Sequence, residues 1–66
     1  MFAPLTTLQT ATALAVRMQR AMNAALDRCD YARYQREAAR LDLAMNDPAF
    51  NWGEFKRLCR VYRVDF

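Results

Sequence analysis

Histidine and isoleucine are absent from this 66-residue chain, which contains only one Gly and two Cys. Without His, a general base would have to be one of the seven Asp and Glu residues, and these fall at expected helix caps or on polar helix faces. A single Gly cannot form the glycine-rich loop that holds a phosphate. These absences predict a protein that is not an enzyme and that uses no cofactor.

Cysteine number and the short apolar runs exclude two further classes. Cys29 and Cys59 stand thirty residues apart with no His, which excludes a zinc site within one chain. Both fall on apolar stripes, so we expect buried and reduced thiols. The longest uninterrupted apolar run, residues 13–16, is too short for a signal-peptide core or a membrane span. We therefore expect a cytoplasmic protein without a membrane partner.

The composition predicts an all-α fold. Val and Thr together number seven, whereas Ala alone accounts for 12 residues and Leu, Met, Arg, Gln and Glu are frequent. These are the strongest helix formers. A chain this short hides only about 60% of the surface that its unfolded form exposes. A second copy of the chain is the simplest source of additional buried surface.

The first expected helix spans about residues 6–29. Thr6 and Gln9 have the spacing of a capping box. Apolar residues then recur in steps of three and four, the heptad pattern of paired helices. Leu14 and Leu26 widen this stripe, which predicts contact with more than one neighbour. We predict a homodimer whose first helices pair along Leu8, Ala11, Ala15, Met18, Met22 and Ala25.

A second helix is expected over about residues 31–46 and a third over 52–63. The second apolar stripe is out of phase with the first, which predicts an antiparallel hairpin that turns near residues 28–30, with Asp30 as the cap of the second helix. A single bent helix of about forty residues is the alternative. Pro48 ends the second helix, and Asn51 caps the third with Glu54 as its box partner.

In architecture alone, a heptad-patterned hairpin over residues 5–45 resembles small plasmid regulators in which two hairpins pair into a four-helix bundle. The likeness concerns the pattern and not the sequence. It carries no function, since one fold hosts many functions.

The third expected helix combines aromatic residues with cations. Trp, Tyr and Arg dominate the energetics of protein interfaces. A solvated helix end, where cations complement the helix dipole, is the plainer interpretation. We predict a partner-binding surface formed by Trp52, Lys56, Arg57, Arg60, Tyr62 and Arg63.

The resulting hypothesis is a small homodimeric adaptor or inhibitor that binds a host protein stoichiometrically, as accessory regulators of phages or plasmids do. The alternative is a nucleic-acid-binding transcriptional regulator, with the second and third helices as a helix-turn-helix. The net charge of +3 is small for that alternative, and the connection over residues 46–51 exceeds the usual three- or four-residue turn.

Overall fold

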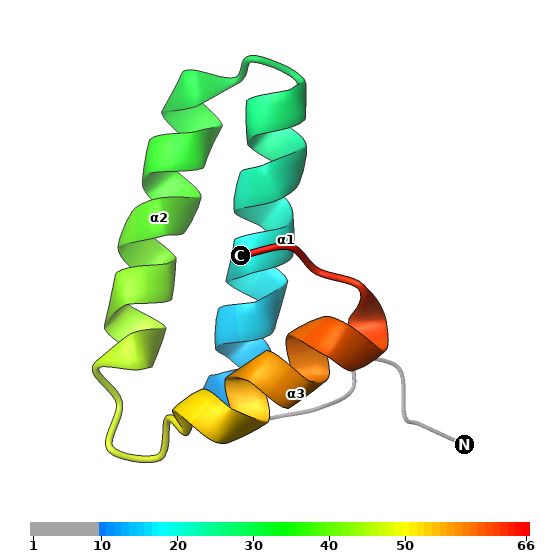
Figure 1. Cartoon of the computed structure of the whole chain (residues 1–66). Coiled ribbons are helices and arrows are strands. Elements are labelled where there is room, and N and C mark those ends of the chain that lie inside the picture. The colour runs from blue at the N-terminus through cyan, green and yellow to red at the C-terminus, as the bar shows by residue number, and fades with distance from the viewer. Residues whose placement is uncertain (1–9) are drawn as a thin grey trace.

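The structure, a computed structural model, describes residues 10–66, which form three α-helices and no strand. Helix α1 spans Ala11–Asp27, α2 spans Tyr31–Met45 and α3 spans Trp52–Tyr62. Helices α1 and α2 lie side by side in opposite directions, α3 crosses one end of this hairpin, and the C-terminal tail runs back over α1 (Figure 1). The all-α class and the close packing of the first two helices are thus confirmed.

Helix α1 begins later than the predicted range of 6–29. Thr10 has an extended backbone (φ −119°, ψ 156°), and its Oγ1 accepts a hydrogen bond of 3.0 Å from the Ala13 N–H. A hydroxyl that satisfies a free N–H of the first turn makes Thr10 the N-cap. The predicted cap Thr6 and the apolar Leu8 lie outside the described residues.

The hairpin turns at residues 28–30, as predicted, and a left-handed cysteine makes the turn. Cys29 has φ 56° and donates its N–H to Leu26 O (3.0 Å), while the Asp30 N–H donates to Ala25 O (2.8 Å). These two bonds form a Schellman motif, whose left-handed position is usually Gly. The alternative of one bent helix is therefore wrong. The expectation that Cys29 is buried is also wrong, because this residue lies in the turn and is exposed.

The predicted caps of α2 and α3 are present, but the second capping box is only half formed. Asp30 Oδ1 accepts from the Arg33 N–H at 3.1 Å, and Asn51 Oδ1 accepts from the Glu54 N–H at 2.9 Å. The Asn51 N–H donates instead to Thr12 Oγ1, 39 residues earlier, at 3.1 Å. This bond ties the start of α3 to the first turn of α1.

The core lies where α1 meets both other helices. Phe55, Val16 and Cys59 are its largest fully buried side chains. Small residues on α1 allow close approach of its neighbours, which agrees with the predicted contact of this helix with more than one partner. The remaining buried members of the core are Ala13, Ala15, Leu41, Ala44, Leu58 and Val64.

Part of the apolar stripe that was predicted to contact a second copy is buried inside the single chain. Ala15 is 0% exposed and Ala25 is 2% exposed within the single chain. These two residues therefore cannot contact a second copy while the chain keeps this fold. Ala11, Met18 and Met22 are half-buried. The buried face of α1 is rotated from the predicted heptad stripe. Helices α2 and α3 of the same chain bury this face, whereas the prediction had a second copy bury the stripe.

Candidate functional site

A surface hollow of about 510 Å³ opens beside the end of α3. Lys56, Arg60 and Arg63 lie at its edge and are exposed, and Phe66 is 67% exposed. Three cations therefore surround one cavity that also has an aromatic wall. We call this the C-terminal hollow, and its lining consists of Lys56, Cys59, Arg60, Arg63, Val64, Asp65 and Phe66.

A left-handed residue at the end of α3 forms the hollow. Arg63 (φ 57°, ψ 49°) reverses the chain, and the Val64 N–H donates to Cys59 O at 2.8 Å. Val64 is then buried, the apolar contact that commonly accompanies this type of helix end. Asn23 Nδ2 donates to Asp65 O at 2.7 Å, which fastens the tail to α1. Figure 1 shows this tail running back over α1, and Phe66 lines the same hollow as the cations, with its ring centroid 5.4 Å from that of Phe55.

An aromatic cluster surrounds the start of α3. The ring centroids of Phe50 and Trp52 lie 5.2 Å apart at 85°, and those of Phe50 and Phe55 lie 5.6 Å apart. Trp52 is 55% exposed, whereas Phe55 is 1% exposed. The ring of Phe66 lies 5.4 Å from that of Phe55. The buried ring of Phe55 therefore contacts the exposed rings of both Trp52 and Phe66.

Phe50 was missed in the sequence-based reasoning, although a signal for it was present. It precedes the N-cap Asn51, and Phe55 is the fourth helical residue. A contact between these two positions is the hydrophobic staple, which fixes the direction in which a chain enters a helix. An aromatic residue immediately before a recognised cap thus predicts this contact.

Arg57 stands apart from the C-terminal hollow. Its Nε donates to Glu54 Oε2 at 2.9 Å, and its Nη2 bonds to Glu54 Oε1. Hydrogen bonding with Arg57 lowers the pKa of the Glu54 carboxyl, and the same bonds raise the pKa of Arg57. Both groups are exposed, so the pair sets the orientation of the side chains more than it stabilises the fold.

The six residues predicted to bind a partner thus occupy different environments. Lys56, Arg60 and Arg63 gather at the C-terminal hollow, whereas Trp52 lies at the opposite end of α3. Tyr62 is half-buried and packs against the core. Three of the six predicted residues therefore line one hollow, together with Phe66 and Asp65.

The remaining chemistry of the site is modest. Burial raises the pKa of the Cys59 thiol, which keeps it protonated near neutral pH and unsuited to nucleophilic attack. Within residues 10–66, no cluster of three or more His, Cys, Asp and Glu side chains is arranged to hold a metal ion. None of the helices formed by these residues has the length and apolar character needed to cross a membrane.

The helices do not adopt the arrangement of a helix-turn-helix. Helix α3 packs on α1 and makes few contacts with α2. In the DNA-binding motif, the recognition helix follows and is positioned by the helix before it. Comparison of the chain with models of known families, with curated proteins and with solved structures found no match.

Proposed function

We propose that the chain is a small, non-enzymatic binding protein, an adaptor or inhibitor that acts by stoichiometric contact with a protein partner. In this proposal the C-terminal hollow receives an acidic segment of that partner. The observation that carries it is the convergence of Lys56, Arg60 and Arg63 on one exposed cavity beside Phe66.

The chemistry of these side chains fits carboxylates. An Arg guanidinium presents a planar set of N–H donors that matches a carboxylate in a bidentate geometry. Phe66 and Trp52, whose rings both contact that of Phe55, offer exposed rings for apolar side chains of the same segment. Exposed aromatic residues next to Arg are the usual anchors of protein interfaces.

The charge distribution favours a protein partner over a nucleic acid. Only three cations line the hollow, and Asp65 lies among them. Arg57, the remaining cation of α3, is engaged by Glu54. A nucleic-acid site gains its affinity from many simultaneous phosphate contacts. A short acidic segment needs fewer cations. Such a segment can also bind near Asp65 if one of its apolar side chains faces that carboxylate.

We also propose that the protein acts as a homodimer. The fold leaves large apolar side chains in contact with solvent, including Leu43 at 74% exposure and Leu14 at 40%. A short chain with a small core gains from covering such groups. Part of the stripe predicted from the sequence is buried within the single chain. The proposed dimer therefore uses a different face.

A titration with two defined probes tests the binding proposal. The first probe is a fluorescent peptide with four consecutive Glu residues followed by Leu, and the second is a short mixed-sequence DNA duplex. We expect Arg60→Glu to weaken peptide binding about tenfold, because the attraction between Arg60 and a carboxylate of the peptide is replaced by repulsion between two carboxylates. Phe66→Ala should weaken it as well, and this loss should persist at high salt.

Arg36→Glu is the matched control, because it makes the same charge change at an exposed site on α2. If it weakens peptide binding as much as Arg60→Glu, net charge drives binding and the hollow is not the site. If the duplex binds more tightly than the peptide, with an affinity that falls steeply as salt rises, a nucleic acid is the partner.

A further inference from the structure

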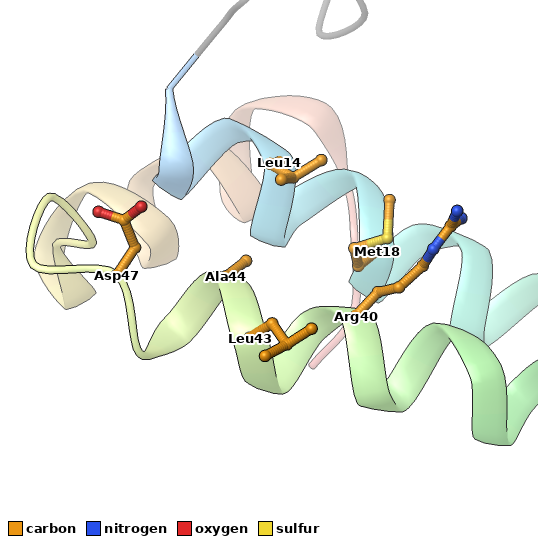
Figure 2. A pocket seen from close by; sticks show the side chains of 6 residues that line it. All are labelled: Leu14, Met18, Arg40, Leu43, Ala44 and Asp47. Carbon is orange, nitrogen blue, oxygen red and sulfur yellow. The ribbon is translucent and has the colours of Figure 1, made fainter.

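A second hollow, of about 470 Å³, lies between α1 and α2. Leu14 and Met18 of α1 line one side of it, and Leu43 and Ala44 of α2 line the other (Figure 2). In this view α3 and the C-terminal tail pass behind the hairpin, so the hollow opens on the side away from the C-terminal hollow. We call it the hairpin groove, and its two remaining lining residues are Arg40 and Asp47.

The two charged residues stand at opposite ends of the hairpin groove, with the apolar side chains between them (Figure 2). They are seven residues apart in the sequence, with Arg40 on α2 and Asp47 in the turn that follows its C-cap Asn46. Leu43 lies between them in sequence and is the most exposed large apolar side chain of the described chain. From one end of the groove to the other, the lining therefore consists of a cation, apolar side chains and an anion.

Such a sequence of charges is complementary to itself after a rotation of 180°. A two-fold axis at Leu43 places Arg40 of each copy against Asp47 of the other, and it brings the two Leu43 side chains together. An unrelated partner would need both charges in the matching order, whereas a second copy supplies them automatically. We propose that the hairpin groove is the surface through which two copies of this chain pair.

Contacts within the chain prepare both ends for this role. Arg40 Nη1 lies 3.6 Å from Oε1 of the buried Glu37, and the Arg40 side chain is 62% exposed. This ion pair keeps the guanidinium near Glu37, and its exposed N–H donors can bind a carboxylate of the second copy. Asp47 Oδ1 accepts the Ala49 N–H at 2.8 Å, which fixes the position of that carboxylate. Side chains that are already fixed lose less conformational entropy on pairing.

This inference rests on the proposed homodimer and is independent of the acidic partner. Its first test is sedimentation of the full chain over a range of micromolar concentrations. We expect wild type to move from the mass of one chain to twice that mass as its concentration rises. Leu43→Asp should weaken pairing about 100-fold, because each dimer loses two apolar contacts and places two carboxylates together.

Leu26→Asp is the matched control, since Leu26 is 51% exposed and lies outside the groove. Circular dichroism should show unchanged helix content for both variants, because neither side chain is buried. A wild type that stays monomeric would overturn the homodimer together with this surface. A wild-type dimer that Leu43→Asp does not weaken more than Leu26→Asp would overturn the surface alone.

Mixing two charge variants tests the two-fold geometry itself. Arg40→Glu alone and Asp47→Lys alone should each pair about tenfold more weakly than wild type, because both ends of the interface become repulsive. An equimolar mixture of the two should recover pairing, since each mixed dimer again has opposite charges at both ends. Failure of the mixture to pair better than either variant alone would refute the proposed arrangement, even if Leu43→Asp dissociates the dimer.

Discussion

Replacement of Cys29 by Gly should stabilise the protein, although the same change inside a helix would destabilise it. Cys29 holds a left-handed backbone (φ 56°) between α1 and α2, and its side chain is exposed. An L-residue in this conformation costs about 1–2 kcal/mol, because its Cβ crowds the backbone. Gly avoids that cost.

The expected gain is smaller than the full cost of the left-handed conformation. Gly has more freedom in the unfolded chain, and this offsets about 0.5–1 kcal/mol. The net effect on the free energy of unfolding should be an increase of about 0.5–1 kcal/mol, or a thermal midpoint higher by roughly 2–8 °C for a domain of this size. Both hydrogen bonds of the turn use backbone atoms only, so the substitution leaves them in place.

Urea unfolding monitored by circular dichroism, at one fixed protein concentration, measures this change. Cys29→Ala is the matched control, because it removes the thiol and keeps the cost of the left-handed backbone. We expect the Gly variant to be more stable than the Ala variant. If residue 29 lay inside one continuous helix, Gly would instead be less stable than Ala by about 1 kcal/mol. A Gly variant weaker than the Ala variant would therefore refute the hairpin turn.

Three further predictions concern the caps, the surface pair and the thiols. Asn51→Ala should lower the free energy of unfolding by about 1 kcal/mol in urea melts, since it removes the acceptor for a first-turn N–H of α3; an unchanged midpoint would contradict the cap. Because its pKa is lowered from 4.5, the Glu54 carboxylate stabilises the fold above that pH and loses this contribution as the pH falls through the lowered value. Thermal melts of Glu54→Gln should show a weaker acid dependence than wild type, and identical curves would count against the pair. Ellman's reagent should modify Cys29 rapidly in the folded protein and Cys59 only after unfolding, since Cys59 is buried and its pKa is raised; two equally fast thiols would contradict this burial.

The second and third helices could be predicted closely, because local chemistry marks their boundaries. Asp30 and Asn51 have short side chains that accept hydrogen bonds from the N–H groups of the following turn, and each does so. Pro48 restricts the residue before it, so α2 had to end near that point. Both helices begin at the predicted residues and end one residue earlier than predicted.

The hairpin turn was the weakest prediction in the chain, since neither Gly nor Pro marks it. A left-handed Cys has no reliable sequence signal, because the cost of this conformation is met by two backbone hydrogen bonds and by the packing of α1 on α2. The phase change between the two apolar stripes and the cap Asp30 were the indications of the turn. They located the turn, but the first of these stripes predicted a buried Cys29, which is in fact exposed.

The candidate site was partly predictable for a related reason. Three of the six residues predicted to bind a partner, Lys56, Arg60 and Arg63, line one hollow. Spacing alone could not show that Glu54 engages Arg57, or that the tail folds back and brings Phe66 to the same hollow. Both features depend on side-chain rotamers and on the left-handed end of α3, which periodicity does not encode.

The small residues of α1 explain why the pairing surface that we propose differs from the stripe predicted from the sequence. Apolar residues repeated in steps of three and four predict that a helix face is buried, but they do not indicate whether the same chain or a second copy buries it. Ala side chains permit two helices to approach α1 closely, and α2 and α3 occupy that face from within the molecule. The large exposed side chains Leu14 and Leu43 are consequently left on the hairpin groove, away from α3. If the two proposals hold together, a dimer joined at its grooves carries two C-terminal hollows, and it binds a partner with two acidic segments more tightly than either chain would alone.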